Sequence, residues 1–68
     1  MEMYTLKTAR DIKKISQKKA AELLNISPDT LRHYEQGKSF PDVKILKQME
    51  KLYGVNYSQL IFLGNDNA

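Results

Sequence analysis

The sequence of 68 residues has no cysteine and no apolar stretch long enough to cross a bilayer. Without cysteine there are no disulfides, thiolate zinc sites or cysteine nucleophiles, which fits an intracellular protein. The longest apolar run is Leu60–Leu63, whereas a membrane-spanning helix needs about 20 such residues. The lysine-rich N-terminal part is not followed by the apolar core of a signal peptide. We therefore expect a single small cytoplasmic domain over residues 1–68, with its core in residues 6–62 and no membrane partner.

Residue types that carry catalysis or bind metals are also scarce. His33 is the only histidine, and there is no cluster of acidic residues at metal-ligand spacing and no glycine-rich phosphate loop. Ser16 and Ser27 each precede a predicted helix, so capping explains them better than nucleophilic chemistry. A chain this short buries only about 60% of its unfolded surface, which disfavours a deep active site. We expect no enzyme activity, no metal and no cofactor, and nothing in the sequence indicates a small-molecule effector.

Positive charge is present but uneven. The formal net charge is +3, and the excess lies in residues 1–38, which hold eight basic and five acidic residues against three of each in residues 39–68. An excess of this size also occurs on ordinary solvated helices, so it indicates a polyanion partner only together with a motif.

Apolar spacing and capping residues predict an all-α fold. Ser27 followed by Pro28 is a strong helix start, and Asn25 tolerates the left-handed conformation that ends the preceding helix. Asn56 with Gln59 three residues later suggests a capping box. Residues 1–4 are left open as an arm, a strand or disorder. The predicted helices cover residues 6–14, 17–24, 28–36, 42–53 and 57–62.

Each helix carries an inward stripe of apolar residues. In the first helix the predicted stripe is Leu6, Ala9 and Ile12, and in the fourth it is Val43, Leu46, Met49 and Tyr53. Ile45 and Leu52 are predicted on the outer side of the fourth helix.

The second and third helices are joined by a short turn and have a small residue, Ala21, at their crossing. This is the arrangement of a helix-turn-helix. A larger side chain at Ala21 would hold the two helices apart. The angle between them is expected to be filled by Leu24, Ile26, Leu31 and Tyr34.

These residues resemble the phage-repressor and Cro type of helix-turn-helix. The resemblance rests on Leu6, Lys7 and Arg10, on Ser16-Gln17, on "SPDTLRHYEQGK" from Ser27 to Lys38, on Pro41 and on "YGVNYSQLI" from Tyr53 to Ile61, and so covers about residues 6–62. Asn25 stands where the family commonly has glycine, and Glu50 where it has a small apolar residue. The resemblance implies a compact five-helix, lambda-repressor-like domain that binds double-stranded DNA with its third helix in the major groove.

On that helix, Leu31 and Tyr34 are predicted to face the core, which leaves the other side for DNA. Arg32 is the strongest base-reading candidate because its planar fork can meet guanine O6 and N7 together. Asp29 has two interpretations, a base contact or a favourable charge at a helix N-terminus. The base-reading candidates are Pro28, Asp29, Thr30, Arg32 and His33, and the phosphate-contact candidates are Gln17, Lys18, Ser27, Lys38 and Lys44.

The resemblance also implies an ion pair between Arg10 of the first helix and Glu35 at the end of the third, which would clamp the third helix to its scaffold. An operator built from two-fold related half-sites implies a homodimer, because one recognition helix contacts few base pairs. The apolar C-terminal segment supplies the candidates for that interface: Tyr57, Leu60, Ile61, Phe62 and Leu63.

We therefore expect a DNA-binding transcriptional regulator, a repressor that acts by occupying its operator. Two alternatives stay open. The same fold can serve as a protein-interaction module, such as an antitoxin or an antirepressor-like partner. The stretch "TLRHYEQG" also resembles the winged helix-turn-helix of mercury-resistance regulators, although that family needs an arginine-bearing wing and a long dimerisation helix after its glycine, whereas Pro41 and a helix follow here.

Overall fold

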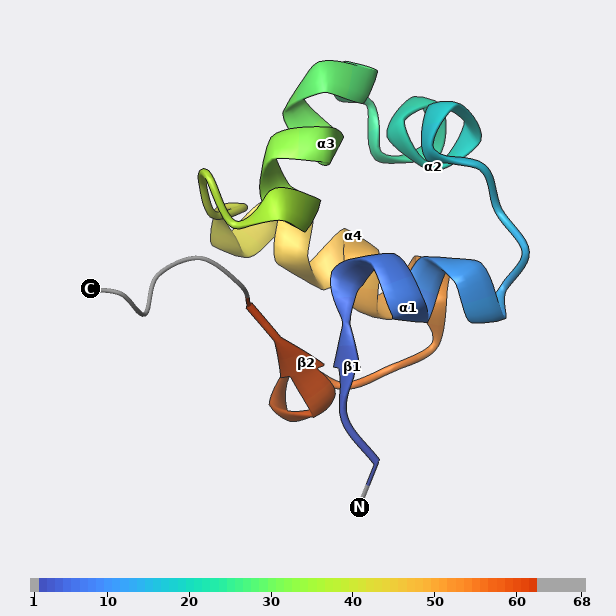
Figure 1. The fold of residues 1–68 in the computed structure, drawn as a ribbon, viewed down its shortest axis with the longest axis vertical. Coiled ribbons are helices and arrows are strands. Elements are labelled where there is room, and N and C mark those ends of the chain that lie inside the picture. Colours follow the sequence, from blue (N-terminus) through green and yellow to red (C-terminus); the bar gives the residue numbers. More distant parts are fainter. Residues whose placement is uncertain (1, 63–68) are drawn as a thin grey trace.

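The computed structural model describes residues 2–62, in which four α-helices, one 3-10 turn and two short strands pack around one core (Figure 1). Helices α2 and α3 lie together at one end, the strand pair lies at the other, and α1 and α4 lie between them. None of these helices has the length and apolar character needed to span a membrane. The elements are β1 (Tyr4–Thr5), α1 (Leu6–Ile12), α2 (Gln17–Leu24), α3 (Pro28–Gln36), α4 (Val43–Tyr53), η1 (Tyr57–Gln59) and β2 (Leu60–Ile61).

Each α-helix begins at a side-chain cap. Thr5, Ser16, Ser27 and Asp42 each accept a hydrogen bond from the backbone N–H three residues later. Such a cap satisfies one of the amides that have no partner inside the helix. The starts predicted from Thr5, Ser16 and Ser27 are confirmed.

Each helix is followed by a residue in the left-handed conformation. These residues are Lys14, Asn25, Gly37 and Gly54, with φ of 59°, 61°, 79° and 70°. At the turn between α2 and α3, the N–H of Ile26 donates to the carbonyl of Ala21 at 3.0 Å, which closes the helix end around Asn25 as predicted. Helix α1 ends at Ile12, earlier than predicted, because Lys14 already has the left-handed conformation that terminates a helix.

The core is assembled from all four helices and β2. Ala21 is fully buried at the α2–α3 crossing, Leu24 and Leu31 are buried beside it, and Ile26 and Tyr34 pack against them. The predicted helix-turn-helix packing is therefore confirmed. The buried apolar residues are Leu6, Ala9, Ala20, Ala21, Leu24, Leu31, Met49, Tyr53 and Leu60.

Two predicted burials and two predicted exposures were wrong. Ile12 is 57% exposed and Val43 is 68% exposed, because each is the terminal residue of its helix, where the neighbouring elements no longer cover the apolar stripe. Ile45 and Leu52 were predicted on the outer side of α4, but both pack against the core.

The predicted fifth helix was wrong: the domain is mostly helical, as predicted, but has four α-helices and a short strand pair. Residues 57–59 form the single turn η1, and Leu60–Ile61 form β2, which pairs in parallel with β1 in the register Tyr4↔Leu60 and Thr5↔Ile61. The backbone N–H of Asn56 donates to Oε1 of Gln59 at 3.0 Å, so the capping contact exists but holds only one turn. A six-residue helix is marginal without extensive packing, whereas the strand pairs the backbone of residues 4 and 5 and buries Leu60.

Candidate nucleic-acid interface

Helix α3 divides into a buried side and an exposed side. Leu31 and Glu35, one turn apart, are buried. The base-reading candidates lie elsewhere on the helix, with Pro28, Asp29 and Arg32 exposed and Thr30 and His33 half-buried. This is the division that the helical spacing predicted.

Ser27 fixes the start of α3. Its Oγ accepts from the backbone N–H of Thr30 at 3.0 Å and donates to Oγ1 of Thr30 at 2.8 Å. The hydroxyl of Ser27 is therefore engaged in capping, and Thr30 keeps its own hydroxyl hydrogen for another acceptor.

Arg32 has a partner on its own helix. Its Nη2 lies 2.9 Å from Oδ1 of Asp29, and the two side chains are 47% and 78% exposed. An ion pair this exposed contributes at most about 1 kcal/mol, so DNA can displace it at little cost. Sequence reasoning missed this pair, although the i,i+3 spacing of an acidic and a basic residue on a helix is its signal.

Arg10 and Glu35 form a buried ion pair between α1 and α3. Nε of Arg10 lies 2.7 Å from Oε2 of Glu35, and Nη2 lies 3.2 Å from Oε1, so the contact is bidentate. The two residues are 7% and 8% exposed. Nη1 of Arg10 also donates to the carbonyl of Ile15 at 2.8 Å, in the segment that joins α1 to α2. The hydrogen bond to Glu35 raises the pKa of Arg10 above its usual value, so the guanidinium stays charged.

Gln17, expected to contact phosphate, joins this buried pair. Its Nε2 donates to Oε1 of Glu35 at 3.0 Å, and the contact is partly buried. The sequence carries no signal for it, because the two residues lie 18 positions apart on different helices.

The three lysines expected at phosphates are exposed on separate elements. Lys18 lies in the first turn of α2, Lys38 lies just after α3, and Lys44 lies in the first turn of α4. Within residues 2–62 none of them forms an ion pair. The backbone N–H of Lys38 donates to the carbonyl of His33 at 2.9 Å, which fixes the chain where it leaves α3.

Tyr53 of α4 has a buried hydroxyl, without a hydrogen-bond partner within residues 2–62, near the Arg10–Glu35 ion pair. The residue is 2% exposed, and among the described residues its Oη has no hydrogen-bond partner. Burial, together with the nearby charge of Glu35, raises the pKa of Tyr53 to about 12.

We expect Tyr53→Phe to raise the free energy of unfolding by about 1 kcal/mol, because a buried hydroxyl without a partner is destabilising. Since Tyr53 holds its proton more tightly in the folded state, wild-type stability should fall as the pH rises from 10.0 towards about 12. The variant should lose this alkaline decline. Urea unfolding at pH 7 and in this alkaline range measures both effects. Tyr57→Phe is the control, because Tyr57 is 56% exposed; a destabilised Tyr53→Phe would contradict the prediction.

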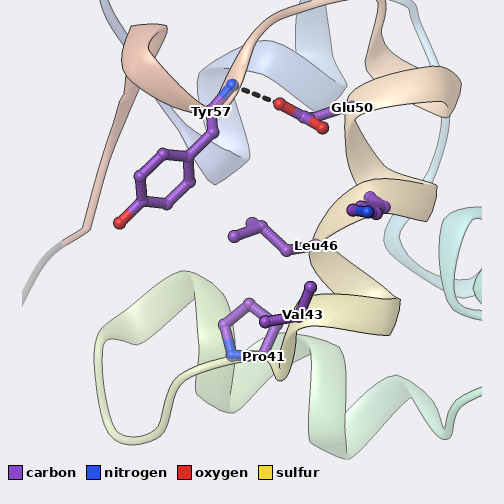
Figure 2. A pocket seen from close by; sticks show the side chains of 6 residues that line it. Pro41, Val43, Leu46, Glu50 and Tyr57 are labelled. Atoms are coloured by element: carbon purple, nitrogen blue, oxygen red, sulfur yellow. Dashed lines mark hydrogen bonds between the residues drawn. The ribbon is translucent and has the colours of Figure 1, made fainter.

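A hollow of about 450 Å³ opens between the loop before α4 and η1 (Figure 2). Its lining includes Pro41, Val43, Leu46 and Tyr57. The carboxylate of Glu50 accepts a hydrogen bond from the backbone N–H of Tyr57. Glu50, which stands where the family commonly has a small apolar residue, therefore links η1 to α4.

The dimer candidates divide around this hollow. Tyr57 and Ile61 are 56% and 40% exposed, whereas Leu60 is 6% exposed and belongs to the chain's own core. Phe62 is half-buried, with its ring centroid 5.8 Å from that of Phe40 and 5.9 Å from that of Tyr57. Leu63 lies outside the described residues.

Other site types find no support in the part of the chain that the structure describes. Residues 2–62 contain no group of three or more potential metal-ligating side chains. Between Gly37 and α4 the chain forms a loop without strands, so the wing required by the mercury-resistance alternative is not there.

Comparison with known proteins gives consistent matches. Multiprotein-bridging factor 1b of Arabidopsis thaliana is 39% identical over 46 residues, which is 68% of this chain and 32% of the relative. Multiprotein-bridging factor 1 of Candida albicans is 34% identical over 50 residues, covering 74% of this chain and 33% of the relative. The HTH-type transcriptional regulator ImmR of Bacillus subtilis is 41% identical over 63 residues, covering 93% of this chain and 48% of the relative.

The chain thus spans from about a third to about half of the length of these curated relatives. The family model described as Helix-turn-helix matches residues 6–60, which is most of the chain and includes both α2 and α3. This chain belongs to the helix-turn-helix family, in the phage-repressor type that its motifs resemble.

Proposed function

We propose that this domain binds double-stranded DNA sequence-specifically and regulates transcription, with α3 in the major groove. The observation that carries the proposal is the division of α3. Leu31 and Glu35 anchor one side to the scaffold, while Asp29 and Arg32 stand exposed on the other. The name of the B. subtilis relative, a transcriptional regulator, supports this function.

In this proposal Arg32 leaves Asp29 and makes two hydrogen bonds to guanine O6 and N7. Thr30 and His33 contact neighbouring base edges, and Pro28 lies against the groove wall. Lys18, Lys38 and Lys44 contact phosphates, which position the domain without reading sequence. Occupancy of a promoter by this contact set is enough for repression. Cytoplasmic localisation stays a prediction.

The domain acts as a homodimer through the surface around the hollow, formed by Phe40, Val43, Tyr57, Ile61 and Phe62. Four of these residues are large apolar side chains at least 40% exposed, a clustering that is typical of interaction sites. Lys47 and Glu50, which also line the hollow, are one turn apart on α4. In a two-fold contact with α4 antiparallel to its copy, each Lys47 would lie beside the other copy's Glu50.

We expect Tyr57→Asp and Phe62→Asp to convert a dimer at micromolar concentration into a monomer, because each buries a charge in the proposed interface. Sedimentation velocity over a concentration series measures the change. Leu23→Asp is the matched control, since Leu23 is 52% exposed but lies on α2. A wild-type protein that is monomeric at all concentrations, and does not pair on DNA, would refute the dimer.

The test of function is selection of bound duplexes from a random pool, which yields the operator, its symmetry and the half-site spacing together. We expect enrichment of a two-fold sequence with half-sites about one helical turn apart. Affinity should also fall steeply with salt, because phosphate contacts release counterions.

A protein-interaction role is the second candidate, and the names of the multiprotein-bridging factors favour it. A failure to enrich any duplex, together with protein binding that changes little with salt, would support this role over DNA binding.

A further inference from the structure

We infer that Gln17 is a positioning residue for DNA reading, which acts through Glu35 rather than only through a phosphate. Its side chain would hold α3 in the orientation at which its exposed face meets base edges. The inference rests on the proposed function, and it assigns to Gln17 a role that a phosphate contact alone would not give it.

The hydrogen bonds of Glu35 carry the argument. Oε2 accepts from Nε of Arg10 at 2.7 Å, and Oε1 accepts from Nη2 of Arg10 at 3.2 Å and from Nε2 of Gln17 at 3.0 Å. The bond from Gln17 is shorter than the second bond from Arg10. Hydrogen bonds to a buried carboxylate are among the stronger ones in proteins. Gln17 is thus a structural partner of the ion pair.

Three segments meet at this carboxylate. Arg10 connects α1 to Glu35, and it also donates to the carbonyl of Ile15, in the link between α1 and α2. Gln17 is the first residue of α2, so its bond adds the start of α2 to the network. Without it, the side chain of Glu35 would be held from α1 alone.

Glu35 is placed to control the orientation of α3. It continues the buried side of that helix one turn beyond Leu31, so a change at Glu35 rotates or tilts the whole helix. The base-reading end at Pro28 lies seven residues away, about 10 Å along the axis at 1.5 Å per residue. A small tilt at Glu35 therefore displaces the N-terminal side chains of α3, where contacts to bases need close geometry.

The chemistry of the amide allows both roles at once. A glutamine NH₂ has two hydrogens, and one is used by Glu35. The other can still meet a phosphate at the start of α2. Removing the Gln17 side chain would lower DNA affinity in a different way for each of these two roles. A lost phosphate contact weakens all sequences equally, whereas a misplaced α3 weakens the selected operator most.

The test compares Gln17→Ala with Ser16→Ala on the selected operator and on a scrambled duplex at fixed salt. Ser16 caps the same end of α2 by accepting from the N–H of Lys19 at 3.0 Å, and in the described structure it forms no hydrogen bond with Glu35. Loss of such a cap lowers the folding equilibrium constant about fivefold, so the control matches a purely structural effect.

We expect Gln17→Ala to reduce the ratio of operator affinity to scrambled affinity about fivefold, the equivalent of one hydrogen bond. Ser16→Ala should leave that ratio unchanged. In the DNA-free protein, amide chemical shifts of α3 should change in Gln17→Ala and not in Ser16→Ala.

Equal weakening of both duplexes by Gln17→Ala, with unchanged α3 shifts, would overturn the inference and leave Gln17 as a phosphate contact. The same fall in ratio for both variants would also overturn it, because the effect would then follow stability. A wild-type protein that does not discriminate between duplexes would instead refute the proposed function, and the α3 shifts would still decide whether Gln17 acts on the helix.

Discussion

Glu35→Ala is expected to lower the free energy of unfolding by about 3–5 kcal/mol, the usual cost of removing one partner of a buried ion pair. Arg10 is 7% exposed and would keep its charge without a carboxylate to pair with. A domain of 68 residues is stable by only about 3–10 kcal/mol, so this loss is a large share of the total. DNA binding should weaken as well, although Glu35 touches no base in the proposed complex.

Urea denaturation monitored by circular dichroism measures this effect, with Glu22→Ala as the matched control. The side chain of Glu22 is 72% exposed and lies 3.7 Å from Nζ of Lys19, so its removal should change stability by less than about 0.5 kcal/mol. Glu35→Gln keeps the shape of the side chain and removes only the charge, which gives a folded variant if the alanine does not fold. An unchanged free energy of unfolding in Glu35→Ala would show that the pair does not clamp α3.

Arg32→Ala should weaken binding to the selected operator by about 1–3 kcal/mol and relax the preference at one position in each half-site. The guanidinium is already oriented on the exposed side of α3 by its contact with Asp29 at 2.9 Å. Displacing Asp29 costs little, and the two hydrogen bonds to guanine replace that contact. Quantitative binding to the operator, to single-base variants of it and to a scrambled duplex measures the effect.

Lys38→Ala is the control for Arg32→Ala because it should fail in a different way. It should weaken all sequences nearly equally and reduce the slope of log affinity against log salt by about one unit. Both variants are compared at the same salt concentration. If Arg32→Ala weakened operator and scrambled duplex by the same factor, Arg32 would be a backbone contact, and sequence reading would fall to Asp29, Thr30 and His33.

The sequence predicts most of the helical scaffold, because the signals are local. Ser16, Ser27 and Asn25 act within three or four residues of their own positions, through caps and a left-handed turn. Ala21 could be placed at the helix crossing because a small residue at that point of the motif has a steric reason. The exposed face of α3 follows from the same spacing that buries Leu31.

The β1–β2 pair could not be predicted in the same way. Each strand has two residues, too few to show an alternating pattern, and the partners lie at opposite ends of the chain. Asn56 and Gln59 carry a genuine helix-capping signal that here ends after one turn. In the candidate site, the Asp29–Arg32 pair had a local signal, whereas Gln17 reaches Glu35 only because tertiary packing brings α2 and α3 together.

The pairing of Tyr4 with Leu60 also has a consequence for the order of folding. The two strands close most of the described chain into one loop, so their contact is among those with the highest sequence separation, and we expect it to form after the local helices. It can also open again while α2 and α3 stay folded, since these helices lie at the other end (Figure 1). We therefore expect the backbone amides of the strand pair to exchange with solvent deuterium faster than those of the buried helices. Such opening would uncover Leu60 beside the proposed dimer surface, so that dimer formation would slow this exchange.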